Sequence, residues 1–212
     1  MGPKTARPPH VDDVLPARAD VTGTHRRLLE VALRTFGDRG FNGVSVRDLA
    51  QGANIHPSSM YAHLASKEAL LMELMIFGHD EHLDRVRTAV ADAQGGAVSR
   101  MRAYVDAHVG FHLDFPLLAR VANRELHALG PDSAAQVLDL RHEAEGLMVT
   151  IIKEGIAEGC FQAPEPWLAA AMIGGMGIRV SEWWDPGGPY TKGRVRQIYT
   201  DGALRILGVV DP

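Results

Sequence analysis

The sequence predicts an all-α protein of about nine helices, arranged as an N-terminal three-helix helix-turn-helix domain and a larger C-terminal helical domain. Three observations lead to this fold class. Apolar residues recur at helical spacing along almost the whole chain, Gly and Pro clusters interrupt that spacing, and no segment alternates polar and apolar residues convincingly as a half-buried strand does. The expected helices span residues 24–39, 45–52, 57–63, 68–93, 97–113, 116–128, 132–158, 165–184 and 191–207.

The first three helices are predicted from the residues at their ends. Gly40 closes the first helix, and Ser45 with Asp48 has the spacing of a capping box that opens the second. Asn54 tolerates the left-handed conformation that a tight turn needs, and Pro57 fits the first position of a third helix. Two short helices joined by such a turn, behind a bracing helix, form a helix-turn-helix unit whose second helix can enter the major groove of DNA. A helical hairpin with no role in DNA binding is the alternative.

The charges are unevenly distributed between the two parts of the chain. Residues 1–67 carry nine Lys or Arg and six Asp or Glu, whereas residues 68–212 carry thirteen and twenty. A basic end on an acidic body suits a protein that presents that end to a polyanion.

The composition is that of a soluble globular chain of one or two domains, with 46% hydrophobic and 23% charged residues and a net charge of −4. The lone Cys160 cannot form an intrachain disulfide, and we expect it to pack as a small apolar residue. The longest uncharged apolar stretch, between Glu165 and Arg179, has 13 residues, fewer than the roughly 20 that cross a bilayer. Residues 1–23 are expected to form a disordered arm without a secretory signal, so we expect a cytoplasmic protein.

The residue pattern of the helix-turn-helix unit is more specific than its spacing. The informative segments are residues 32–36 (ALRTF), 40–41 (GF), 44–50 (VSVRDLA), 60–64 (MYAHL) and 66–70 (SKEAL). This pattern resembles the tetracycline-repressor (TetR) family. The resemblance implies a homodimeric repressor that binds a palindromic operator in double-stranded DNA and is released by a small-molecule inducer. The departures are few: Asn54 replaces the usual Gly, Met60 and Leu64 replace commoner Leu and Phe, and His56-Pro57 opens the third helix.

The resemblance places base recognition in the first turn of the third helix. We expect Ser58 and Ser59 to read bases there, as short donors that need a close approach. Contacts to phosphates, which fix register without reading sequence, are expected from Arg47, Tyr61, His63 and Lys67. The alternative for Tyr61 is half-buried packing with only its hydroxyl exposed.

The helix expected over residues 165–184 is the most informative part of the C-terminal domain. Its segment 168–178 is apolar on every side, which predicts burial all round. Small residues that allow a second helix to approach closely are Ala169, Ala170, Ala171, Gly174, Gly175 and Gly177. In the TetR family the last two helices pair with their copies in a second subunit, so the resemblance implies dimerisation through 165–184 and 191–207. An intramolecular core is the alternative.

Arg179 and Trp183 lie four residues apart, which places a guanidinium and an indole on one helix face. A buried arginine requires an anion. The anion can be a phosphate of an incoming ligand whose flat ring stacks on Trp183. It can equally be an acidic residue of this chain, with Trp183 stacked on the guanidinium. The candidate acidic partners are Glu154, Glu158 and Glu182.

Residues 177–186 (GIRVSEWWDP) also resemble the corresponding segment of TetR relatives that sense acyl-CoA thioesters, including repressors of fatty-acid and sterol catabolism. The resemblance implies an acyl-CoA inducer, with Arg179 and Trp183 as ligand contacts. Arg120 and Arg124 share another helix face, either as further phosphate contacts or as ordinary surface charge. The remaining pocket wall is expected from Tyr104, His108, Phe111, Leu147 and Ile151.

Ten histidines include two pairs with helical spacing, His79 with His82 and His108 with His112. A metal site would need further ligands, so hydrogen-bonded or solvated histidines are the favoured interpretation and no metal or cofactor is expected. The chain has no glycine-rich phosphate loop and no nucleophile elbow, so we do not expect the protein to be an enzyme. The alternatives to an acyl-CoA-responsive repressor are a multidrug-type sensor of uncharged or cationic apolar compounds and a helical enzyme or scaffold.

Overall fold

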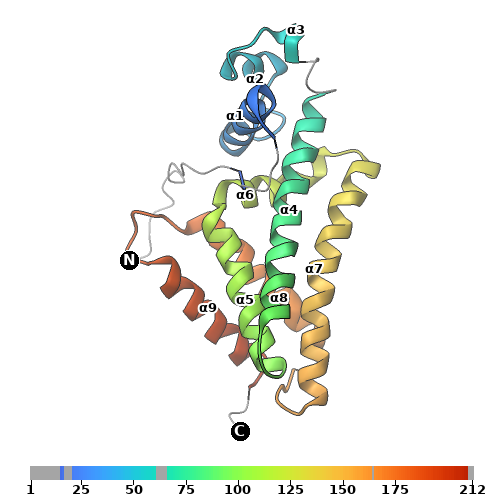
Figure 1. Ribbon diagram of the computed structural model, residues 1–212, viewed down its shortest axis with the longest axis vertical. Helices are drawn as coiled ribbons and strands as arrows, with labels where there is room; N and C mark the ends of the chain where they lie inside the picture. The colour runs from blue at the N-terminus through green and yellow to red at the C-terminus, as the bar shows by residue number, and fades with distance from the viewer. Residues whose placement is uncertain (1–14, 17–20, 61–65, 164, 210–212) are drawn as a thin grey trace. The chain divides into compact units, whose positions relative to one another are not determined.

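The computed structural model describes residues 15–16, 21–60, 66–163 and 165–209. Within these residues the chain forms nine α-helices and one short 3₁₀ helix, with no strand (Figure 1), so the predicted all-α fold class is confirmed. The α-helices are α1 (Gly23–Arg39), α2 (Val46–Gly52), α3 (Pro57–Met60), α4 (Lys67–Asp92), α5 (Ala97–Asp114), α6 (Pro116–Arg124), α7 (Pro131–Ala157), α8 (Pro166–Trp183) and α9 (Lys192–Ile206), and the 3₁₀ helix is η1 (Leu126–Ala128).

The described residues pack into two compact units. The first contains α1 to α3, the start of α4, α6, η1 and the start of α7, and the second contains the rest of α4 and α7 with α5, α8 and α9. Most of the predicted arm, residues 1–23, lies outside the described residues. Leu15, which is described, is buried.

The helix ends of the first unit follow the sequence signals. α1 ends at Gly40, whose φ of 71° is favourable only for glycine. In the capping box before α2, Ser45 Oγ accepts a hydrogen bond from the Asp48 N–H at 3.2 Å, and the Asp48 carboxylate accepts from the Ser45 N–H at 2.8 Å. Asn54 has a φ of 54°, so the predicted left-handed turn between α2 and α3 is confirmed.

The core of the first unit is formed by the apolar face of α1. Its buried side chains are those that the helical periodicity predicts, Leu28, Leu29, Ala32, Leu33 and Phe36. α6 lies against α1, because a Cβ placed on Gly37 would overlap the Leu117 side chain. α6 also contacts α4, where a Cβ on Gly78 would lie 3.3 Å from Leu118. Both glycines allow these helices to approach closely.

In the second unit, α5 packs against both α8 and α9. The Tyr104 hydroxyl on α5 donates to the carbonyl of Ala144 on α7 at 2.8 Å. At the end of α5, the Asp114 carboxylate accepts hydrogen bonds from Lys192 of α9 and Arg85 of α4, at 2.7 and 2.8 Å. Polar contacts therefore join α5 to α4, α7 and α9.

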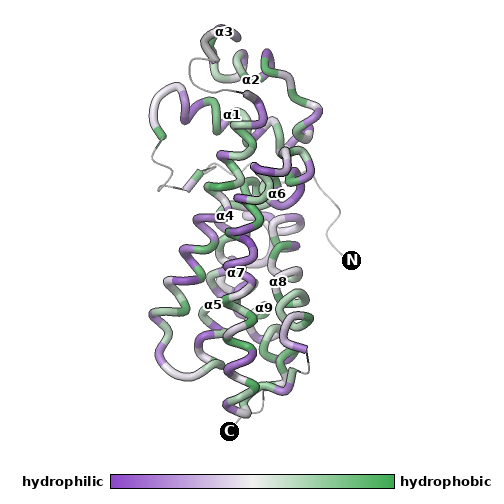
Figure 2. The backbone as a smooth tube through the Cα atoms, turned by 90° about the vertical axis from the view of Figure 1, so that its right-hand side faces the viewer, coloured by the Kyte–Doolittle hydropathy of each residue, from purple (hydrophilic) through white to green (hydrophobic). Residues whose placement is uncertain are grey.

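α8 differs from the predicted burial on all sides. Ala170, Ile173 and Val180 are buried, but Trp167, Leu168 and Met172 are 54–60% exposed. Figure 2 shows the hydrophobic colouring that runs along this helix. Helical periodicity shows that a face is apolar but not what covers it, so a single chain leaves half of this surface open to solvent.

Two further points concern the limits of the helices. The helix expected over residues 116–128 ends at Arg124, and η1 follows with i to i+3 hydrogen bonds, because the chain must turn before α7 begins at Pro131. Among the described helices, none has both the length and the hydropathy needed to cross a bilayer.

His108 is a buried polar residue at the centre of the second unit. Its Nδ1 lies 2.7 Å from His82 Nε2, its Nε2 lies 3.1 Å from the Gly174 carbonyl oxygen, and its ring also contacts the rings of Tyr104 and His112. Burial lowers the pKa of His108 to about 4, although the Gly174 carbonyl opposes this shift. The imidazole is therefore neutral in the folded protein at neutral pH.

This lowered pKa predicts a loss of stability in weak acid. Unfolded His108 takes up a proton near its ordinary pKa of about 6.5, whereas the folded residue stays neutral until pH 4. The free energy of unfolding should therefore fall by roughly 2 kcal/mol more between pH 7 and pH 5 in the wild type than in His108→Gln. Urea unfolding at the two pH values measures this difference. Equal pH dependence in both proteins would contradict the prediction.

Candidate functional site

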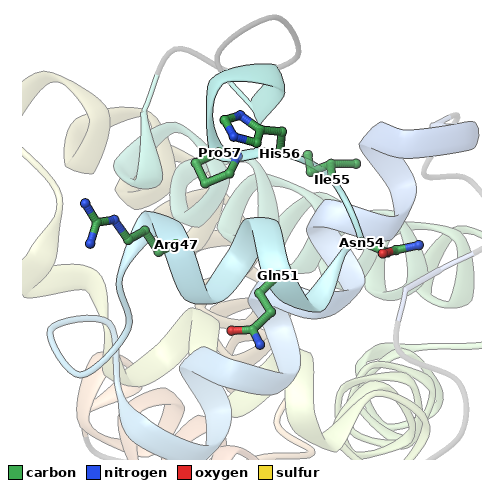
Figure 3. Close-up of a pocket in the computed structure, with 6 residues that line it drawn as sticks. All are labelled: Arg47, Gln51, Asn54, Ile55, His56 and Pro57. Carbon is green, nitrogen blue, oxygen red and sulfur yellow. The ribbon is translucent and has the colours of Figure 1, made fainter.

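An open groove of about 580 Å³ lies on the first unit between α2 and the start of α3. Figure 3 shows its six lining residues, which come from α2 and from the turn that leads into α3. They are Arg47, Gln51, Asn54, Ile55, His56 and Pro57. Arg47, Gln51, Asn54 and His56 are exposed, so the groove presents charged and amide groups around an apolar floor.

The predicted DNA-binding residues fall into three groups in the structure. Arg47 and Ser58 are exposed on α2 and α3, as contacts to DNA require. Tyr61 and His63 lie outside the described residues, as do the side chain of Ser59 and the end of the helix expected over 57–63. Lys67 belongs to a third group, because its side chain is half-buried.

The Lys67 ammonium group is held inside the first unit. Its Nζ donates to the backbone carbonyls of Phe41 and Val44, each at 2.9 Å, and lies 3.9 Å from the centroid of the Phe41 ring. The first residue of α4 is thereby joined to the turn that precedes α2. The predicted phosphate contact stays a prediction, since two of the three ammonium protons already have partners.

Arg179 and Trp183 occupy the end of α8. Arg179 is exposed, so the premise of a buried guanidinium that requires an anion is wrong for this chain. Glu154 of α7 and Glu158, which follows that helix, were considered as its partners, but both pair with Arg100 of α5. Trp183, considered either as a partner of the guanidinium or as a stacking surface for a ligand ring, contacts two aromatic rings of this chain.

The aromatic cluster around Trp183 comes from three segments of the second unit. The Trp183 ring stacks on Tyr199 of α9 at 6.4 Å between centroids and meets the edge of Tyr190 at 6.5 Å. Trp183 is 38% exposed and Tyr190 is 52% exposed. Sequence spacing alone could not find Tyr190 and Tyr199, because the loop between α8 and α9 brings them back to α8.

The residues expected to line a ligand pocket are only partly brought together. Tyr104, His108, Phe111 and Ile151 are buried in the second unit and Leu147 is half-buried, with Tyr104 and His108 in ring contact. Burial, with Glu145 nearby, raises the pKa of the Tyr104 hydroxyl, which therefore stays protonated. Arg120, which is buried, and Arg124, which is exposed, belong to the first unit.

The histidine pairs are arranged as hydrogen-bonding groups. The ring nitrogens of His82 and His108 contact each other, and His112 Nδ1 contacts the His108 carbonyl at 2.8 Å. Throughout the part of the chain that the structure describes, no three His, Cys, Asp or Glu side chains are placed to hold a metal ion.

Two family models match the chain. Residues 28–74 match the model of bacterial regulatory proteins of the TetR family, and residues 94–207 match the tetracyclin repressor-like C-terminal domain. The chain belongs to the TetR family. The family resemblance that the helix-turn-helix residues indicated is thus confirmed.

Two relatives and one further solved structure illustrate the similarity. The HTH-type transcriptional repressor KstR2 of Mycobacterium tuberculosis is 29% identical over 84% of this chain and 90% of its own, and the structure of this ketosteroid transcriptional regulator superposes with a TM-score of 0.81. A TetR-family regulatory protein from Rhodococcus RHA1 has a TM-score of 0.83 and 29% identity over 90% of this chain and all of its own. AibR, solved with isovaleryl coenzyme A and operator DNA, has the same fold at 22% identity and a TM-score of 0.77, over 89% of this chain and 100% of its own.

The bonds made by Lys67 predict a structural contribution from this residue. Lys67→Met keeps the apolar stem but removes two charge-assisted hydrogen bonds, so we expect the free energy of unfolding to fall by roughly 2 kcal/mol. Arg47→Met, at an exposed position on α2, is the control and should unfold like the wild type. Urea unfolding compares them. An unchanged Lys67→Met stability would mean that the ammonium is free to contact phosphate.

Proposed function

We propose that this TetR-family protein is a ligand-responsive transcriptional repressor that binds a palindromic operator as a homodimer. Residues 24–67 form the DNA-binding part and residues 68–212 the part for ligand binding and dimerisation. The observation that carries the proposal is the exposed polar groove on a helix-turn-helix unit whose residues match the TetR model. The similarity to KstR2, a transcriptional repressor related over most of the chain, supports it.

The exposed face of α8 supports a homodimer. Leu168 and Met172 lie one helical turn apart and expose large apolar side chains, and Gly175 follows on the same face with no atom near its Cβ position. Ile198 exposes a further apolar side chain on α9. Such a surface is typical of a helix that packs against a second copy. A dimer also doubles the few base pairs that one short recognition helix can contact.

The preferred inducer is an acyl-CoA thioester. Arg179 supplies an exposed guanidinium for a phosphate, and the partly exposed aromatic cluster of Trp183, Tyr190 and Tyr199 offers a ring surface for the adenine base. Tyr104, His108 and Ile151 form the buried wall for the acyl part. Arg120 and Arg124 stay predictions as phosphate contacts. The alternative is a sensor of uncharged or cationic apolar compounds, for which Arg179 has no role.

Release of the operator requires a ligand that binds one of two protein conformations more tightly than the other. A ligand with equal affinity for both conformations does not change the equilibrium between them. α4 contributes residues to both units and starts at Lys67. A displacement of that start acts on the loop before α2 through the carbonyls of Phe41 and Val44. α6, packed against α1 and α4, has to move with them.

The proposal predicts how DNA and inducer compete. The wild type should select a two-fold symmetric sequence from random duplexes, with an affinity that falls steeply with salt. An acyl-CoA should release that DNA and change tryptophan fluorescence, whereas the free acid should do neither at equal concentration. Arg179→Met should bind the operator normally but need at least tenfold more acyl-CoA for release, because it loses charge-assisted hydrogen bonds. Fluorescence anisotropy of labelled operator measures both.

Each outcome of this competition bears on a separate part of the proposal. If the wild type prefers no sequence, it is not a specific repressor. Selective binding that an uncharged or cationic apolar compound reverses, but no acyl-CoA does, would support the multidrug-type alternative. If Arg179→Met responds like the wild type, Arg179 does not bind the inducer.

The proposed dimer predicts the effect of a charge on α8. Gly175→Glu should leave the fold intact, because nothing lies within 4 Å of the added Cβ in one chain. In a dimer it would bury an unpaired carboxylate, so dimerisation should weaken by at least a hundredfold and operator affinity should fall with it. Analytical ultracentrifugation gives the assembly state. Gly146→Glu, at another open position but on α7, is the matched control. A Gly175→Glu protein that stays dimeric would place the interface elsewhere.

A further inference from the structure

His56, which immediately precedes α3, makes two contacts with a residue of that helix. Its Nδ1 lies 3.3 Å from the backbone nitrogen of Ser58 and 2.7 Å from Ser58 Oγ. The backbone N–H can only donate a hydrogen bond, so Nδ1 must be the acceptor. The ring proton is then on Nε2. The ring is exposed, so this second nitrogen offers a donor to molecules outside the chain.

The same contacts determine what Ser58 can offer. Because Nδ1 carries no proton, the Ser58 hydroxyl donates to it at 2.7 Å and keeps only its lone pairs for another partner. The sequence predicts Ser58 as a donor to a base, but the structure gives it the opposite polarity. Ser58 accepts, and the donor at this place is His56 Nε2.

His56 lies at the groove described above, between the turn at Asn54 and the start of α3. His56 lines the groove together with Arg47, Gln51 and Asn54 (Figure 3). Two backbone features fix its position: the left-handed turn at Asn54, with φ of 54°, and Pro57, whose ring restricts its own φ. The imidazole is thus presented by a stiff segment, as a group that reads DNA needs to be.

We propose that His56 is a specificity-determining residue, which donates from Nε2 to an acceptor on a base edge in the major groove and orients the Ser58 hydroxyl through Nδ1. This inference rests on the proposed function, because it requires operator binding. Major-groove acceptors are purine N7, guanine O6 and thymine O4. A phosphate is the less suitable partner, since Arg47 in the same groove offers a charged, multidentate donor for it.

Two substitutions separate the roles of the two ring nitrogens. Asn at position 56 can still accept from the Ser58 N–H, because Asn is among the best residues for capping a helix start, but its amide ends short of the Nε2 position. Gln reaches about as far as Nε2 and carries an N–H there, but it lacks an acceptor at the position of Nδ1. Arg47→Met, which removes a proposed phosphate contact, is the control.

The experiment measures the affinity of each protein for the selected operator and for every single base-pair change in one half-site. His56→Asn should melt like the wild type yet lose roughly tenfold discrimination at one base pair, with unchanged binding to random DNA. His56→Gln should keep more of that discrimination. Arg47→Met should weaken binding to all sequences alike and reduce the salt dependence. An operator with a 7-deazapurine at the affected base pair lacks the N7 acceptor, so its affinity shows whether the acceptor is N7.

Three results would overturn the inference. A His56→Asn profile parallel to that of the wild type at every position would show that Nε2 reads no base. Uniform weakening on all sequences, with a smaller salt slope, would show that the imidazole contacts a phosphate. A wild type with no sequence preference would overturn the proposed function as well, whereas the first two results leave it intact.

Discussion

The first unit depends on the position of one half-buried cation. Lys67 stands at the first residue of α4, and its ammonium replaces water with two backbone carbonyls and the face of Phe41. The carbonyls of Phe41 and Val44 lie in the loop between α1 and α2, where no helix satisfies them. A single side chain therefore donates to two carbonyls of this loop, of which that of Phe41 also accepts from the Val44 N–H, and joins the start of α4 to the loop that precedes α2.

Local signals in the sequence predicted the local structure well. The capping box of Ser45 and Asp48, the turn at Asn54 and the end of α1 at Gly40 were all readable, because each involves residues within four positions of one another. Lys67 was not, because its partners lie 23 and 26 residues earlier and nothing in the sequence around it distinguishes a bonded ammonium from a solvated one. The same reason explains the contact between His82 and His108, which face each other across 26 positions.

The candidate sites were predicted less completely than the fold. Arg179 was expected to be buried because it follows an apolar segment. Successive residues of an α-helix point in different directions, however, and Arg179 lies on the solvent-exposed side of α8. Ser58, predicted to read a base, is exposed, and its hydrogen-bonding polarity depends on the ring of His56 two residues away. The identity of a residue predicts which donors and acceptors it carries. Only the geometry of the fold shows which of these atoms are left to contact DNA or a ligand.

The close approach of α6 to α1 depends on the missing side chain of Gly37. The end of the Leu117 side chain occupies the space where a methyl group would be, so a larger residue at position 37 requires that side chain to move. Under the proposed function, a substitution there changes the contact between α1 and α6 without replacing a residue proposed to contact DNA or ligand. Repressors of this fold can thus differ in the basal expression of their target genes without inducer while they retain the same operator and inducer.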